Sequence, residues 1–233
     1  MRGRDAEREG LLVMKEIKIA LLFALTALLL SGCMIGGVHG SGVRKTEKRD
    51  LPAFNSIETS GAFEVEVICQ EPASFEIEAD DNIVPLIQTE VKNGVLHVST
   101  TRSYSSGGGI KLRITVPDLA SVKSTGAGKF RVSDVKNDNF EIQSMGAAQV
   151  VASGQSKSVK IDSTGAGKID AHNLRANNAE VSVTGAAGVD VYATDELDVT
   201  VSGAGRVTYS GNPKVNKHIS GAGQVTKKEG TGV

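Results

Sequence analysis

A Gly-Ala turn that recurs along the second half of the chain constrains the fold more than any other feature. Its copies read TGAGKF, MGAAQV, TGAGKI, TGAAGV, SGAGRV and SGAGQV. Their first glycines are 20, 19, 20, 18 and 18 residues apart: Gly126, Gly146, Gly165, Gly185, Gly203 and Gly221. A period near twenty residues with strand-like content is typical of a solenoid, in which each repeat forms one coil. A phosphate-binding loop is not expected, because no copy carries a G-x-G-x-x-G or G-K-[ST] signature.

Apolar and polar residues alternate on both sides of each glycine. Around Gly165, Val159 and Ile161 precede the turn and Ile169 follows it, with polar residues between them. This period of two residues indicates strands with one buried face. We expect the turn to need glycine for its φ angle, and the alanine after it, such as Ala166, to fit inside the corner. The residues before the glycines should form a ladder of hydroxyls along the corner: Thr125, Met145, Thr164, Thr184, Ser202 and Ser220.

The sequence therefore predicts one all-β domain over residues 44–233, folded as a single-stranded parallel β-helix with coils of about 18–20 residues. The crossover rule favours right-handed winding. Residues 119–227 should form the regular coils, and residues 44–118 irregular coils or a cap. A further Ser-Gly-Ala turn at Gly61 lies 65 residues before Gly126, with room for about three wider coils or for a cap on the first edge. The expected total is roughly nine or ten coils.

The N-terminus reads as a targeting segment. Residues 1–32 are predicted to be a signal peptide that truly starts at Met14, because lysines precede a short apolar run at residues 19–30. Leu-Ser-Gly before Cys33 resembles a bacterial lipobox, so we expect the mature chain to begin at a lipid-modified Cys33. Residues 33–43 should then form a flexible tether. An ordinary secretory signal and an uncleaved anchor are the alternatives.

Two sets of outward-facing residues are candidate sites. Three residues after the glycines stand Lys129, Lys168 and Arg206, which form a mildly basic stripe. This stripe is either a solvated face or the contact for an acidic glycan or a lipid head group. Asp170 and Asp190 stand at equivalent positions of successive coils, at a separation that suits a retaining glycosidase. The alternative to an active site is that both are simply solvated surface aspartates.

Other chemistries find little support in the sequence. The chain has 26 basic and 27 acidic side chains, so nucleic acid is not an expected partner. Its four histidines are scattered, and no metal site, cofactor or catalytic residue is predicted. A lipidated Cys33 leaves Cys69 as the other cysteine, and Cys69 should be a small apolar residue at a strand end.

Four stretches together resemble a known family. They are LPAFNSIETSGAFEVEVICQ, EIEADDNIVPLIQTEVKNGVLHVST, IKLRITVPDLASVKSTGAGKF and the Gly-Ala coils, spanning Leu51 to Val225. Their order and spacing are similar to those of the head GIN domain, described as a "putative auto-transporter adhesin" head. The resemblance implies a parallel β-helix on a bacterial envelope protein, and it brings no catalytic residues.

The expected function is a non-enzymatic envelope lipoprotein, with an adhesin-like surface for binding or scaffolding. Its expected partners are the membrane, through Cys33, and envelope glycans or proteins, with the outer membrane as the favoured location. A β-helix enzyme acting on polysaccharides through Asp170 and Asp190 is the rival from another class. An envelope-stress accessory protein is a further alternative.

Overall fold

The structure is a computed structural model that describes residues 37–228 of the chain. These residues form strands joined by tight turns and one short 3₁₀ helix. The elements are β1 (Val38–His39), β2 (Arg44–Lys48), β3 (Ser56–Gly61), β4 (Phe63–Cys69), β5 (Ser74–Asp80), η2 (Val84–Leu86), β6 (Ile87–Lys92), β7 (Val95–Thr100), β8 (Tyr104–Ser105), β9 (Ile110–Val116), β10 (Ser121–Gly126), β11 (Lys129–Gly146), β12 (Gln149–Gly165), β13 (Lys168–Gly185), β14 (Gly188–Gly203), β15 (Arg206–Gly211), β16 (Lys214–Gly221) and β17 (Gln224–Lys227).

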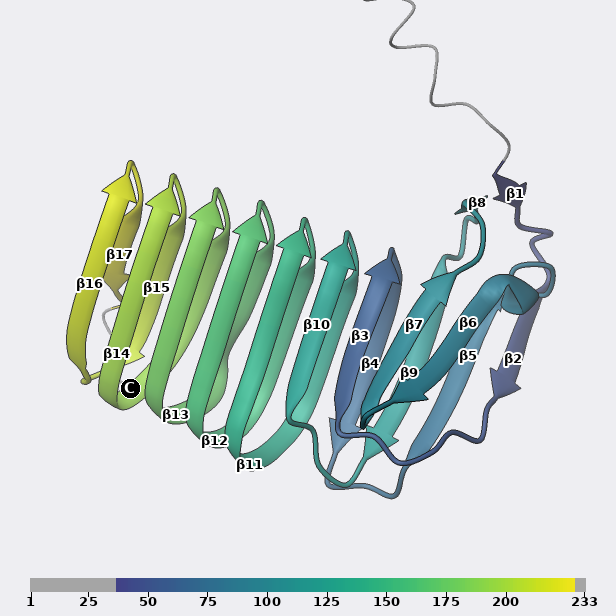
Figure 1. Ribbon diagram of the computed structural model, residues 1–233, viewed down its shortest axis with the longest axis horizontal. Helices are drawn as coiled ribbons and strands as arrows, with labels where there is room; N and C mark the ends of the chain where they lie inside the picture. The colour runs from purple at the N-terminus through teal and green to yellow at the C-terminus, as the bar shows by residue number, and fades with distance from the viewer. Residues whose placement is uncertain (1–36, 229–233) are drawn as a thin grey trace, which may run out of the picture. The chain divides into compact units, whose positions relative to one another are not determined.

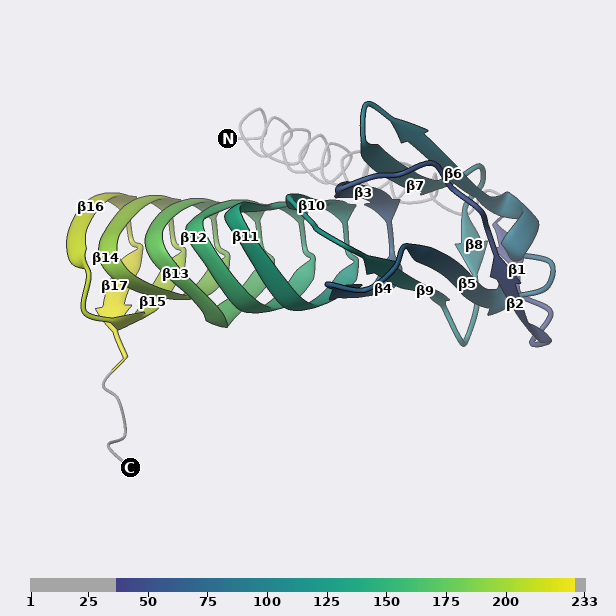
Figure 2. The ribbon, with the colours of Figure 1, turned by 90° about the horizontal axis from the view of Figure 1, so that it is seen from below.

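The strands build a flattened parallel β-solenoid with two walls (Figures 1 and 2). We call the wall whose strands run toward the corner glycines the ascending wall. It holds β3, β7, β10, β16 and the second halves of β11 to β14. The descending wall, whose strands leave the corners, holds β4, β9, β15, β17 and the first halves of β11 to β14. Each of the long strands therefore runs down one wall, bends through the edge opposite the glycines and climbs the other wall.

The predicted fold class is confirmed, but the predicted number of coils is wrong. The chain climbs the near wall, crosses the glycine edge, descends the far wall and advances toward its C-terminus, which is right-handed winding (Figures 1 and 2). The solenoid has about five turns, not nine or ten. The estimate was too high in part because it allowed for about three coils between Gly61 and Gly126, where the structure inserts none.

The corner geometry explains why glycine recurs. Gly165 has a φ of +121°, a conformation that side chains rarely adopt. A Cβ atom on Gly165 would also lie 2.4 Å from the carbonyl oxygen of Gly146, the corner residue of the preceding coil. That oxygen accepts a 2.9 Å hydrogen bond from the Ala166 N–H. The corner glycines stack in register in this way along the edge: Gly61, Gly126, Gly146, Gly165, Gly185, Gly203 and Gly221.

The small residue inside each corner is not the one predicted. Ala166 and the other alanines that follow the corner glycines are exposed. The buried residue stands one position further on, as at Gly167, where a Cβ would lie 2.7 Å from the Ala148 carbonyl oxygen. Alternation with a period of two continues through the corner without a break, so the residue after the glycine must face outward.

The core lies between the two walls and is lined by stacked apolar columns. One of these columns, four residues before the glycines, is nearly inaccessible to solvent: Val122, Ile142, Ile161, Val181 and Val199. A second column, two residues before the glycines, is polar in its first half, where it runs from Thr59 through Ser124 and Ser144 to Ser163. Among the described residues these four hydroxyls have no hydrogen-bond partner. The predicted ladder one residue before the glycines is exposed on the surface, and this buried ladder was not predicted.

The chain between Gly61 and Gly126 inserts no coils between these two corners. Gly61 pairs directly with Gly126, and β4 pairs directly with β11. The intervening residues lie beyond β3 and β4, where β7 and β9 add one more layer to the two walls. Antiparallel strands then close the end, because β6 pairs with β7, β5 with β9 and β2 with β5. The sequence left open whether this stretch forms wider coils or a cap, and in the structure it forms a cap.

Arginine and aspartate side chains hold this cap together. Arg49 donates hydrogen bonds to the carbonyl oxygen of Ile87 at 2.8 Å and to Glu47 Oε1 at 2.9 Å. The buried Asp80 accepts a 2.9 Å hydrogen bond from Ser106 and lies 3.4 Å from Arg44 Nη1. The hydrogen bond from Ser106 lowers the pKa of Asp80; burial opposes this effect and Arg44 adds to it.

Part of the predicted tether carries hydrogen bonds to the domain. The Ser41 N–H donates to Asn82 Oδ1 at 2.9 Å, and Asn82 Nδ2 donates to the His39 carbonyl oxygen at 2.7 Å. The predicted signal peptide at residues 1–32 and Cys33 lie outside the described residues. Within residues 37–228, no helix has the length and apolar character needed to cross a bilayer.

Candidate functional site

The outer face of the descending wall carries the predicted basic stripe. Lys129, Lys168 and Arg206 are exposed and lie in one column, with Gln149 and Gly188 between them. Adjacent parallel strands are about 4.8 Å apart, so successive cations of this column are separated by two such steps, or about 10 Å. The stripe is therefore a row of separated cations, not a continuous basic ridge.

Gly188 opens a hollow between Lys168 and Arg206, which we call the Gly188 hollow. A Cβ atom built on Gly188 would find no other atom within 4 Å, so the missing side chain leaves space at the surface. The hollow has a volume of about 490 Å³, and Asp190 and Gln224 stand at its rim with the two cations. Two basic groups thus flank a recess with an alanine- and glycine-rich floor, which is a suitable place for an anionic group.

Lys129 belongs to a second, different hollow further toward the cap. This recess of about 280 Å³ is lined by charged residues of both signs from β4, β9 and β11. Glu64 lies in register between Lys111 and Lys129, and Glu66 between Arg113 and Arg131. Because each carboxylate has a basic residue on either side, Lys129 faces a neutralised surface. Lys168 and Arg206 instead share their hollow with one carboxylate, Asp190, and the charge of Lys168 also acts on Asp170.

Asp170 and Asp190 are neighbours, as their equivalent positions predicted, because β13 and β14 pair them in register. Burial raises the pKa of Asp170, but hydrogen bonds from the His172 ring and backbone N–H outweigh it, so the pKa is lowered overall. A glycosidase acid must hold its proton near neutral pH, which requires a raised pKa. The Asp170 carboxyl group is thus unsuited to act as that acid.

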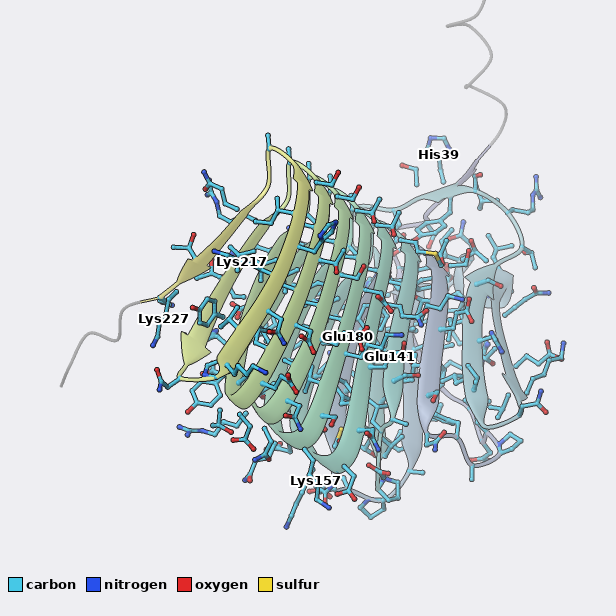
Figure 3. All side chains as sticks on the ribbon, turned by 60° about the vertical axis from the view of Figure 1, so that its left-hand side comes forward. His39, Glu141, Lys157, Glu180, Lys217 and Lys227 are labelled. Carbon is cyan, nitrogen blue, oxygen red and sulfur yellow. The ribbon has the colours of Figure 1, made fainter. Side chains whose placement is uncertain are left out.

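The ascending wall is more acidic. Glu141 and Glu180 lie on its outer face with Lys160 between them in register (Figure 3). Lys160 Nζ lies 3.4 Å from Asp162 and 3.6 Å from Glu141. The hydrogen bond that Lys160 donates to Asp162, the charge of Asp162 and the charges of Glu141 and Glu180 raise the Lys160 pKa. Exposed pairs of this kind contribute under about 1 kcal/mol each, so we assign this wall a solvated surface.

An aromatic contact that the sequence did not predict lies at the edge opposite the glycines. Arg175 stacks over the ring of Tyr192, 5.4 Å from its centroid, in a recess of about 500 Å³ that also includes Lys136 and Lys157. Lys157, labelled at this edge in Figure 3, forms an ion pair with Asp138, with 2.9 Å between Lys157 Nζ and Asp138 Oδ1. The register of Arg175 with Tyr192 follows an irregularity in the β13–β14 pairing, which spacing counts do not predict.

Thiol and metal chemistry finds no site in the described part of the chain. Cys69 ends β4 and is buried, as expected for a small apolar residue. Burial, with the nearby Asp118 and Asp134, raises its pKa to about 12, so it stays a thiol at neutral pH. Within residues 37–228, histidine, cysteine and acidic side chains do not gather into a group of three that could hold a metal ion.

Comparisons with known proteins agree with this architecture. A family model described as "Putative auto-transporter adhesin, head GIN domain" matches residues 53–213. A crystal structure of a "putative adhesin" from Bacteroides fragilis is similar, with a TM-score of 0.63, 27% identity, and coverage of 82% of this chain and 99% of that chain. No curated protein matches the chain.

Two further crystal structures share the fold at lower identity. A "putative adhesin" from Parabacteroides merdae has a TM-score of 0.56 and 20% identity, covering 83% of this chain and 99% of that one. A "Putative lipid binding protein" from Parabacteroides distasonis has a TM-score of 0.54 and 21% identity, covering 83% of this chain and 100% of that one. With the fold and the residue 53–213 match in agreement, the chain belongs to the head GIN domain family of "putative auto-transporter adhesin" proteins.

Proposed function

We propose that this protein is a non-enzymatic, adhesin-like binding module of the bacterial envelope, and that the Gly188 hollow binds acidic glycans. The family and the adhesins among the similar structures support the adhesin-like function. The single observation that carries the ligand assignment is the pair of cations, Lys168 and Arg206, on either side of a residue without a side chain.

The chemistry of the hollow suits a uronate or a sulfated sugar. The Arg206 guanidinium can donate two parallel hydrogen bonds to a carboxylate or sulfate, and the Lys168 ammonium adds a point charge. Asp190 and Gln224 offer acceptors and a donor for sugar hydroxyls. A single shallow recess binds weakly, so useful affinity comes from many copies on one cell facing a repeating polymer.

Glycan-array binding of the purified full chain tests the proposal, with acidic and neutral glycans side by side. Gly188→Leu fills the recess without changing charge, and the Lys168→Gln, Arg206→Gln double variant removes both cations. We expect either change to abolish retention on acidic glycans. Lys129→Gln is the matched control, because Lys129 lies in the same column outside the hollow and its loss should leave binding intact. Binding that depends equally on Lys129 would contradict the assignment.

The enzyme alternative has its own decisive measurement. Turnover of an acidic polysaccharide by the wild type, lost in the Asp170→Asn, Asp190→Asn double variant, would refute the binding-module proposal. We expect no turnover, and the Asp170 carboxyl group, with its lowered pKa, could not be the protonated acid of such a pair.

We further propose that the chain is anchored through a lipid on Cys33 and resides at the outer membrane. The order of lysines, apolar run and lipobox in residues 14–33 supports this proposal. Metabolic labelling with a fatty-acid probe should mark the wild type, and membrane fractionation should recover it with the membranes. Labelling that persists in Cys33→Ser would contradict the anchor.

A further inference from the structure

The C-terminal end of the solenoid exposes strand edges that the rest of the fold covers. Within residues 37–228, β16 pairs only with β14 and β17 only with β15, so the outer edge of each strand is unpaired. The inward side chains are uncovered as well. Ile219 is 38% exposed, whereas Val201, its neighbour in the same column, is 0% exposed. The last coil thus presents both free backbone groups and an apolar face, which is the acceptor geometry for an added strand.

Lysine occupies a position in this coil that is apolar in the other regular coils. Lys217 pairs in register with the buried Val199 and continues its column, so its side chain belongs to the inward set. An uncharged strand placed over β16 would bury this ammonium without a partner, which is unfavourable. A strand with an Asp or Glu opposite Lys217 would instead form an ion pair between two apolar contacts, at Val215 and Ile219.

The other charged residues of this last coil are also positive. Residues 212–228 contain four lysines and no acidic residue: Lys214, Lys217, Lys227 and Lys228. Figure 3 shows Lys217 and Lys227 together at this end of the solenoid. A second copy docked end to end would bring two such clusters together, and like charges in an interface are unfavourable. An acidic partner is attracted by the same charges.

We propose that the open edge of β16 accepts an extended acidic segment of a partner protein as an additional strand. The segment has an Asp or Glu opposite Lys217 and apolar residues two positions to either side, opposite Val215 and Ile219. Backbone hydrogen bonds along the edge give the affinity, and Lys217 selects the partner by excluding strands without an acid at this position. This inference goes beyond the proposed glycan binding and uses a different surface.

The test uses the full chain in detergent and a fluorescein-labelled peptide, Thr-Val-Thr-Asp-Thr-Val-Thr, followed by fluorescence anisotropy. We expect saturable binding, and binding at least about tenfold weaker when Lys replaces the peptide's Asp. N-methylation of alternate peptide amides should abolish binding, because it removes main-chain donors. In Lys217→Glu the preference should invert, so that the Lys peptide binds and the Asp peptide does not. This rescue shows that the variant still folds.

A matched control separates strand addition from general attraction. Lys214→Gln with Lys228→Gln removes two positive charges, the same change in charge as Lys217→Glu, at exposed positions outside the inward columns, and it should weaken binding only about twofold. Equal binding of the Asp, Lys and N-methylated peptides would overturn the proposal, as would a loss in the control as large as in Lys217→Glu. Concentration-dependent dimerisation of the wild type in sedimentation, competing with the peptide, would also overturn it, because a second copy would then be the occupant.

Discussion

At the N-terminal end the solenoid is closed by antiparallel strands that are held by charged hydrogen bonds, whereas the regular coils are held by a repeated backbone ladder and stacked glycines. The cap depends on individual side chains such as Arg49 and Asp80. In the coils, each corner repeats the contact of Gly165 with Gly146. We therefore expect the coils to tolerate substitutions of exposed residues but not of corner glycines. The cap should be sensitive to the loss of single polar side chains and to pH.

The largest expected effect comes from Gly165→Val in the coils. The new side chain combines a strained φ with overlap of the Gly146 carbonyl oxygen, and we expect a loss of about 3 kcal/mol or more in unfolding free energy. Gly42→Val is the control, because Gly42 also has a positive φ but open space around it, and it should cost about 1 kcal/mol. Denaturant midpoints measure both. Similar midpoints would mean that stacking does not govern the corners.

Arg49→Ala should open the cap without unfolding the coils. It removes hydrogen bonds to Glu47, Ile87 and the Thr89 hydroxyl, a loss of about 2 kcal/mol in local stability. Amide hydrogen exchange should therefore accelerate in β2 and β6 and stay unchanged in β12 and β13. Lys45→Ala, on the exposed side of β2, should alter neither. Faster exchange in every coil would show that cap and coils unfold as one unit.

Acid should loosen the cap before it affects the coils. A hydrogen bond from Arg44 lowers the pKa of Glu78, with burial opposing it, and Ser106 and Arg44 lower that of Asp80. A carboxyl group with a depressed folded-state pKa stabilises the fold above its ordinary value, near pH 4, and this stabilisation is lost as pH falls further. Exchange in β5 should rise below about pH 4 in the wild type. The rise should be smaller in Arg44→Gln, and an unchanged profile would contradict the assignment.

The smallest expected effect has the opposite sign. Ser144→Ala removes a buried hydroxyl that lacks a hydrogen-bond partner among the described residues, and it should stabilise the coils by about 1 kcal/mol. Thr164→Val, on the exposed side of the same edge, should change stability by less than about 0.5 kcal/mol. Thermal melting distinguishes them, and destabilisation by Ser144→Ala would show that the hydroxyl is in fact satisfied.

The regular coils could be predicted because their geometry repeats in the sequence. The even spacing of glycines and the alternation around Val159 and Ile161 determine the register, the parallel pairing and the buried columns. The same alternation, followed through the corner, would also have placed Ala166 outside and Gly167 inside. The error came from assuming that the residue nearest the bend must face the core.

The cap and the site could not be predicted in this way. β5, β6 and β9 all show the alternation of half-buried strands, and nothing local decides which neighbour each pairs with or in which direction. The Gly188 hollow depends on Gly188 lying between Lys168 and Arg206, which the column of residues did contain. The hollow can be inferred only when adjacent coils are known to align, because a missing side chain leaves a recess only if its neighbours in the column lie on either side of it.

The direct stacking of Gly61 on Gly126 has a consequence for how the molecule forms. Coils from Gly126 onward each contact a neighbour about twenty residues away, so they can add one at a time. The strands β3 and β4 must instead wait for partners up to 65 residues later in the chain. Such distant closures are slow, because loop entropy is lost before contacts compensate for it. In a chain that emerges N-terminus first, β3 and β4 therefore cannot join the regular coils until residues 121–133 have emerged.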